Sequence, residues 1–249
     1  MVENSRIRLS QIAPSVITVF AICAGMTSVR MSLEGRLEAA LLFILIAVFL
    51  DAADGKLARY LDTASPFGAE LDTLADFFNF GIAPGILIFN TLYLGTEYEN
   101  LGWLASLVLA VCCALRLARF NLSLDDEKAA VKPKGFFTGV PAPALACLAL
   151  LPVFLQLSGW ENVDFPIVRA MYIHGVGLLA VSTIPTFSIK HTSIKRKNLA
   201  FVVVASVIFI VCVMTFPWRT LIAIDLIYIA TLPLSYRAYQ AQLKAMNPT

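Results

Sequence analysis

The chain is short of charged residues. Only 14% of its 249 residues are Asp, Glu, Lys or Arg, whereas soluble domains carry about 25%. Hydrophobic residues make up 59% of the chain, and the mean hydropathy is +0.78. This composition excludes an ordinary soluble domain and predicts a polytopic membrane protein.

The chain also lacks the usual ligands of a zinc site. Five cysteines fall inside apolar runs without CxxC spacing, and they are Cys23, Cys112, Cys113, Cys147 and Cys212. We interpret them as small buried hydrophobic residues. The two histidines, His174 and His191, have no partner at a metal-ligand spacing. No motif for reading a DNA or RNA groove is present either, so we expect no nucleic-acid partner.

Apolar runs long enough to cross a bilayer recur along the whole chain. They lie near residues 14–32, 37–60, 70–95, 101–122, 139–158, 168–188, 198–216 and 219–237. The first run follows Arg6 and Arg8, as a signal peptide would, but Val16 to Val29 lacks a convincing small-residue cleavage site. The pattern therefore predicts an all-α polytopic bundle of about eight transmembrane helices.

We expect residues 1–249 to form a single membrane domain. Within it, residues 1–190 would form a six-helix core and residues 191–249 would add two C-terminal helices. Because these two helices carry no motif, we assign them packing or dimer contacts by default and leave a homodimer open.

The lysines and arginines are distributed unequally between the two sides of such a bundle. With the N-terminus inside, fifteen fall on inner segments, namely Arg6, Arg8, Lys56, Arg59, Arg116, Arg119, Lys128, Lys132, Lys134, Lys190, Lys195, Arg196, Lys197, Arg237 and Lys244. The outer segments hold four, Arg30, Arg36, Arg169 and Arg219. The positive-inside rule thus favours an even number of spans in the cytoplasmic membrane, with the inner loops in the cytoplasm.

Four aspartates stand close together between the second and third apolar runs. Their 26-residue pattern is Asp51-x2-Asp54-Gly55-x2-Ala58-Arg59-x8-Gly68-x3-Asp72-x3-Asp76. In helices, the first pair shares one face at i,i+3 and the second pair shares one face at i,i+4. Facing each other, the pairs would form an all-oxygen cage suited to Mg²⁺ or Mn²⁺.

The alternative is that these aspartates are loop residues paired with Lys56 and Arg59. Two cations cannot neutralise four acids, and loop acids need no helical spacing. Intramembrane aspartates also occur in cation transporters, but the repeat symmetry expected of a transporter is not evident here.

The complete aspartate pattern resembles the signature of the CDP-alcohol phosphotransferases, integral membrane enzymes of phospholipid synthesis. The resemblance implies that Asp51, Asp54 and Asp72 mainly hold the metal, and that Asp76 is the catalytic base and also touches the metal. Asp54 and Arg59 would both take part in binding CDP-diacylglycerol, with Arg59 contacting its phosphates. The small residues Gly55, Ala58 and Gly68 would leave room for the nucleotide to approach the helix backbones.

The fourth apolar run ends with Arg116, Arg119 and Asn121, which could bind a carboxylate or a lipid phosphate. Together with residues 80–84 and 137–143, this segment resembles the phosphatidylserine synthase branch of the family, although Asn79 stands where a small residue is expected. The branch implies L-serine as the second substrate. Glycerol 3-phosphate, choline or inositol remain alternative acceptors. Choline would call for an aromatic cage instead of arginines.

Overall fold

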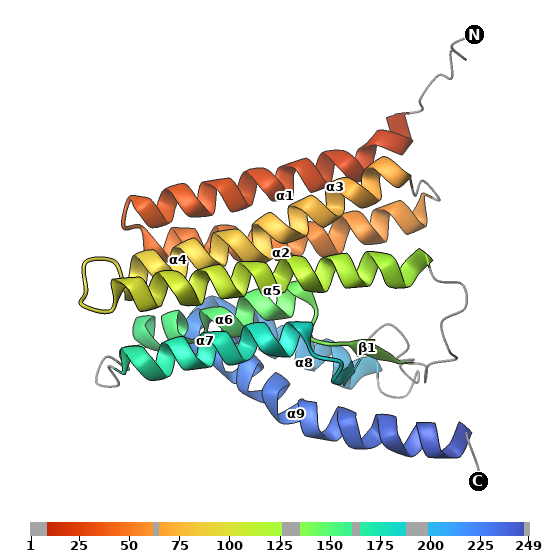
Figure 1. Ribbon diagram of the computed structural model, residues 1–249. Helices are drawn as coiled ribbons and strands as arrows, with labels where there is room; N and C mark the ends of the chain where they lie inside the picture. Colours follow the sequence, from red (N-terminus) through yellow and green to blue (C-terminus); the bar gives the residue numbers. More distant parts are fainter. Residues whose placement is uncertain (1–8, 62–64, 126–134, 161–164, 188–198, 247–249) are drawn as a thin grey trace. The chain divides into compact units, whose positions relative to one another are not determined.

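A computed structural model describes residues 9–61, 65–125, 135–160, 165–187 and 199–246 (Figure 1). These residues are mostly helical, and they divide into two compact units, Met1–Leu117 and Ala118–Thr249. The long helix α5 passes from the first unit into the second. Each unit is described here by itself.

The first unit contains helices α1 to α4, a π-helical segment and most of α5. Their bounds are α1 Leu9–Leu33, α2 Leu37–Tyr60, α3 Pro66–Phe77, η1 Phe78–Ile82, α4 Ala83–Leu92 and α5 Glu99–Asp125. A tight turn at Gly35, with φ +73°, returns α2 antiparallel along α1 (Figure 1). Buried alanines let the two backbones approach closely, and Ser28 Oγ donates to the Ala40 carbonyl at 2.7 Å.

Helix α3 begins at a well-formed N-terminus. Ser65 is the N-cap, its Oγ accepts from the Gly68 N–H at 3.0 Å, and Pro66 occupies the first helical position. Both features are typical of helix starts because they satisfy or remove N–H groups that have no partner within the helix. This start fixes the position of the first turn of α3. Asp72 follows Gly68 by about one turn, and Asp76 follows it by about two turns.

The helix that carries Asp72 and Asp76 changes its winding directly after them. Residues Phe78–Ile82 form a π-helix, in which the Ala83 N–H bonds to the Phe78 carbonyl. Beyond it, α4 packs on α5, where Ser106 Oγ donates to the Gly85 carbonyl at 2.8 Å. Segments of π-helix are frequent at functional sites.

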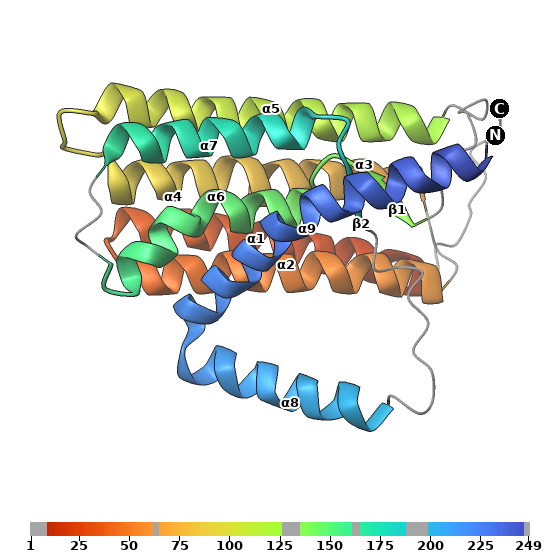
Figure 2. The same cartoon turned by 90° about the horizontal axis from the view of Figure 1, so that it is seen from below.

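Beyond the end of α5, the described residues of the second unit form helices α6 to α9 and one short strand pair. Their bounds are α6 Ala142–Leu157, α7 Pro166–Val181, α8 Leu199–Thr215, α9 Pro217–Met246, β1 Phe136–Thr138 and β2 Pro185–Phe187. The strands pair antiparallel, with Phe136 opposite Phe187. Helix α6 is the most buried helix of this unit and packs on α7 and α9. Helix α8 connects to α9 through Phe216 and is largely exposed (Figure 2).

The helices confirm the predicted all-α bundle, since helix covers each of the eight predicted apolar runs. One boundary was wrong: the run predicted to end at residue 188 ends as helix at Val181, because residues 185–187 pair as strand β2. Within the described residues, four helical segments are long and apolar enough to cross a membrane, namely Ala13–Leu33, Pro66–Leu92, Glu99–Leu122 and Pro217–Met246. The chain is a multi-pass integral membrane protein. The division of the chain into a six-helix core, residues 1–190, and two added helices, residues 191–249, stays a prediction.

Candidate active site

Three carboxylates, one from α2 and two from α3, converge in the first unit. One oxygen each from Asp51, Asp72 and Asp76 lies within 4.8 Å of the other two. All three side chains are half-buried. The sequence predicted a site made by all four aspartates, whereas the structure brings three of them, from two helices, to one point.

Asp54 lies outside this group of three and has a partner of its own. It is only 4% exposed, and its Oδ2 accepts a hydrogen bond from Thr18 Oγ1 at 2.7 Å. Thr18 belongs to α1, and its hydroxyl also lies 3.1 Å from the Pro14 carbonyl. The sequence pattern gave no signal for Thr18, because its role depends on how α1 packs against α2.

The donor set fits a hard divalent cation. Three carboxylates at this separation repel one another, and in a poorly solvated site a cation offsets that repulsion. Mg²⁺ and Mn²⁺ prefer carboxylate oxygens and commonly share their coordination with substrate phosphates. The cluster contains no cysteine or histidine, so its chemistry does not favour zinc.

The small residues near the aspartates have different surroundings. A Cβ built on Gly55 would meet no described atom within 4 Å, so the space beside this turn of α2 is open. A Cβ on Gly68 would lie 3.1 Å from Ser65 Oγ, and helix capping therefore accounts for Gly68. Ala58 lies on α2, but its side chain is outside the described part of the structure.

Arg59 is exposed on the last turn of α2. Its Nε donates to the Gly55 carbonyl at 2.9 Å, which holds the side chain along the helix toward the open space at Gly55. Arg59 thus lies on the same helix as the two aspartates, a little more than one turn after Asp54 and about two turns after Asp51. This placement suits an anionic group that approaches the aspartates.

The two arginines of α5 have different environments. Arg116 belongs to the first unit and lies close enough to Asp76 for its positive charge to act on that carboxylate. Arg119 belongs to the second unit, where its guanidinium donates to the carbonyls of Ala180, Val181 and Ser182. These are the last carbonyls of α7, so Arg119 caps that helix.

Asn121 lies on a different face of α5 from Arg116. Five residues along a helix correspond to a rotation of about 140° between their side chains. Helical geometry therefore does not bring Asn121 to Arg116, and its predicted role in serine binding stays a prediction.

Comparison with known proteins identifies the family of this chain. The family model described as CDP-alcohol phosphatidyltransferase matches residues 11–232. The chain belongs to this family. All four aspartates lie inside the match, which also extends beyond residue 190 into α8 and most of α9.

Relatives in this phosphatidyltransferase family share one name. The CDP-diacylglycerol–serine O-phosphatidyltransferase of Mycobacterium leprae (strain TN) is 38% identical over 226 residues, covering 90% of this chain and 74% of the relative. The protein of that name from Mycobacterium tuberculosis H37Rv is 33% identical, covering 92% and 79%. The one from Bacillus subtilis (strain 168) is 32% identical, covering 69% and 87%.

Proposed function

We propose that the chain is a CDP-diacylglycerol–serine O-phosphatidyltransferase. It transfers the phosphatidyl group of CDP-diacylglycerol to the hydroxyl of L-serine and releases phosphatidylserine and CMP. The names of its relatives support this assignment. The structural observation that supports it most directly is the cluster of Asp51, Asp72 and Asp76, whose carboxylate oxygens lie within 4.8 Å of one another and could hold the metal of a phosphotransfer site.

The nucleotide end of the site would be formed by α2. The open space beside Gly55 leaves room for the pyrophosphate, and Arg59 supplies N–H donors for its oxygens. Thr18 holds the Asp54 carboxylate toward α1, so that Asp54 keeps one orientation. Asp51, Asp72 and Asp76 would hold a divalent cation, Mg²⁺ or Mn²⁺, with Asp54 at the edge of the site. When bound, the cation supplies Lewis-acid stabilisation of the charge that develops on the pyrophosphate oxygens.

The acceptor end would be formed by Asp76 and Arg116. The guanidinium of Arg116 binds the serine carboxylate, which places the serine hydroxyl near Asp76. Asp76 takes the hydroxyl proton as the serine oxygen forms a bond to the phosphatidyl phosphorus. The bond from that phosphorus to the bridging oxygen breaks, CMP leaves with its electron pair, and Asp76 later returns the proton to water.

Glycerol 3-phosphate is the second candidate acceptor, because Arg116 could bind its phosphate as well as a carboxylate. Choline and inositol carry no anionic group for Arg116. We also propose that the site faces the cytoplasm, because fifteen of the nineteen basic residues fall on that side of the predicted topology.

The role of Arg116 is tested by steady-state kinetics of Arg116→Ala. Loss of a charge-assisted contact of roughly 1.5–3 kcal/mol should raise the serine KM about tenfold to hundredfold. The KM for CDP-diacylglycerol should stay near the wild-type value, and kcat should change less than the serine KM.

A matched control is Arg30→Ala, which removes an exposed arginine paired with Glu34 on α1. It should leave both KM values unchanged. If Arg116→Ala instead weakens CDP-diacylglycerol and leaves the serine KM unchanged, Arg116 binds lipid phosphate, and the structural support for serine is lost.

A further inference from the structure

Asn79 stands where the family pattern leads us to expect a small residue, and the proposed reaction gives it no role. It lies in the π-helix η1, three residues after Asp76, and is only 1% exposed. Its Oδ1 is buried and has no hydrogen-bond partner among the described residues. Burying an acceptor without a partner costs free energy, so hydrogen bonding does not explain why an amide is placed here.

The room for this carboxamide comes from a glycine of α1. A Cβ built on Gly25 would lie 2.1 Å from Asn79 Oδ1 and 3.1 Å from its Cγ. It would also lie 3.2 Å from Cδ1 of Phe78, the first residue of the π-helix. Gly25 and Asn79 therefore fit each other closely, and a larger residue at either position would push the π-helix away from α1.

The face of α1 that contains Gly25 also holds another part of the site. Thr18 lies seven residues before Gly25, which is about two helical turns, so the two residues share one face. Thr18 donates to Asp54 of α2, whereas Gly25 contacts Asn79 directly after the helix that carries Asp76. Helix α1 packs against α2, α3 and η1. One face of α1 thus sets the positions of both aspartate-bearing helices.

The other side of the π-helix is packed just as closely, against α5. A Cβ on Gly81 would lie 3.0 Å from Cys113 Cβ and 3.3 Å from its Sγ. Cys113 is fully buried, precedes Arg116 by about one turn, and lies within electrostatic reach of Asp76. Figure 2 shows α3 and α4, which η1 joins, between α5 and α1. Close contacts therefore hold the π-helix on two sides, beside Asp76.

We propose that Asn79 is a positioning residue for Asp76. Packed against Gly25, it fixes the rotation of the π-helix and thereby directs the Asp76 carboxylate toward Asp51 and Asp72. A π-helical turn holds an extra residue, so the rotation of the helix before it depends on the side chains that pack against the turn. This role rests on the proposed function, because the carboxylate cluster is taken as the metal site of that reaction.

The test measures Mn²⁺ binding to the full chain in detergent, from the electron paramagnetic resonance signal of free Mn²⁺, and needs no turnover. Gly25→Ala introduces a clash and Asn79→Ala leaves a void, so each should weaken Mn²⁺ binding about tenfold. In the double variant, the added methyl group at position 25 occupies space that the carboxamide leaves. Its affinity should return to within about threefold of the wild type.

The double variant decides the outcome. A loss of about a hundredfold, the product of the two single effects, would show that the two residues act independently and would overturn the proposal. Wild-type Mn²⁺ affinity in Asn79→Ala would overturn it as well. Should Gly25→Ala fail to fold, folding of the double variant with near wild-type affinity is the expected rescue, and its failure to fold contradicts the matched fit.

Thermal midpoints separate positioning from general stability. Asn79→Ala loses packing but also removes a buried acceptor without a partner, so its midpoint should stay within about 2–4 °C of the wild type. Weaker Mn²⁺ binding at a nearly unchanged midpoint is the result expected of a positioning residue. A large fall in midpoint with unchanged Mn²⁺ binding would make Asn79 a packing residue alone.

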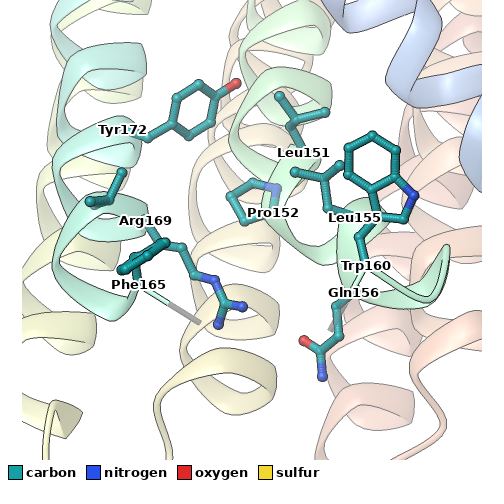
Figure 3. Close-up of a pocket in the computed structure, with 9 residues that line it drawn as sticks. Leu151, Pro152, Leu155, Gln156, Trp160, Phe165, Arg169 and Tyr172 are labelled. Carbon is teal, nitrogen blue, oxygen red and sulfur yellow. The ribbon is translucent and has the colours of Figure 1, made fainter. Parts of the chain in front are cut away.

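Two control variants lower stability without touching the contact between α1 and the π-helix. A Cβ on Gly102 of α5 would lie 2.1 Å from Tyr93 Cγ, so Gly102→Ala creates a clash as close as that of Gly25→Ala. Leu151 lines an apolar cavity of about 310 Å³ between α6 and α7 in the second unit (Figure 3), and Leu151→Ala enlarges it. Both variants should lower the midpoint and keep wild-type Mn²⁺ affinity. Equal weakening of Mn²⁺ binding in Gly102→Ala would overturn the proposal.

CMP release then separates this proposal from the proposed function. In Asn79→Ala, the Mn²⁺ concentration for half-maximal release should rise about tenfold, and the serine KM should change less. If the wild type releases no CMP with serine while the double variant still restores Mn²⁺ binding, the acceptor assignment fails and the positioning role stands. If the wild type uses serine but the double variant does not restore Mn²⁺ binding, the positioning role fails alone.

Discussion

At the scale of single residues, the four aspartates of the pattern are not equivalent. Asp51, Asp72 and Asp76 form one cluster, whereas Asp54 is buried beside α1 and bonded to Thr18. The sequence could predict the cluster because regular helices fix which residues share a face. It could not predict the hydrogen bond from Thr18 to Asp54 or the cap that Arg119 makes on α7. Both depend on how helices that are separate in the sequence pack against each other.

The hydrogen bond of Thr18 predicts a measurable effect on the site. Thr18→Val keeps the shape of the side chain and removes the donor to Asp54, so the Mn²⁺ concentration for half-maximal CMP release should rise about tenfold. Thr27→Val is the matched control, since among the described residues Thr27 Oγ1 donates to the Cys23 carbonyl of its own helix and not to an aspartate. Equal behaviour of the two variants would show that Thr18 does not orient Asp54.

At the scale of elements, the apolar pattern located the helices, but it did not predict two local departures from regular helix. The π-helix at Phe78–Ile82 requires one extra residue per turn, which hydropathy does not reveal. The β1–β2 pair joins residues 136–138 to residues 185–187, which are distant in the sequence. Its position depends on tertiary packing, so no local propensity could have located it.

Gly139 connects this strand pair to the end of α7. Its N–H bonds to the Ile184 carbonyl, and its φ is +77°. A Cβ at this position would lie 2.6 Å from the Ala180 carbonyl oxygen and 2.9 Å from that of Ser182. These are two of the carbonyls that Arg119 caps. The geometry of this corner therefore depends on a residue without a side chain.

We predict that Gly139→Ala lowers the thermal midpoint of the protein in detergent by several degrees. Left-handed backbone costs an alanine about 1–2 kcal/mol, and each kcal/mol corresponds to roughly 2–4 °C for a chain of this size. Gly135→Ala shares the left-handed φ, but its Cβ would meet no described atom within 4 Å, so the decrease in its thermal midpoint should be smaller. Equal thermal midpoints in the two variants would show that a Cβ at position 139 does not clash with the carbonyl oxygens at the end of α7.

At the scale of the whole molecule, the chain is a multi-pass membrane protein whose family match extends over most of its length. The match includes α8 and most of α9, which the sequence alone assigned to an addition after residue 190. The boundary between the two compact units falls within the sequence of α5, between Arg116 and Arg119. From their spacing in the sequence alone, these two arginines were expected to bind the same anionic group.

The topology can be tested with single cysteines in a variant whose five native cysteines are replaced. Tyr60→Cys lies at the exposed end of α2, and Glu97→Cys lies in the exposed turn before α5. With the N-terminus inside, a reagent that cannot cross the membrane should label only the cysteine at position 97 in intact cells. Labelling at position 60 would place the aspartates on the outer side and contradict the cytoplasmic site.

The most direct measurement of the central claim is an acceptor assay on the purified protein. CDP-diacylglycerol and Mn²⁺ are incubated with L-serine, glycerol 3-phosphate, choline or inositol in turn, and both CMP and the lipid product are measured. Asp76→Asn serves as the blank, since loss of a general base lowers turnover about 10²–10⁴-fold. We expect CMP release with L-serine alone, matched by an equal amount of phosphatidylserine. Faster CMP release with glycerol 3-phosphate or another acceptor than with serine would contradict the account.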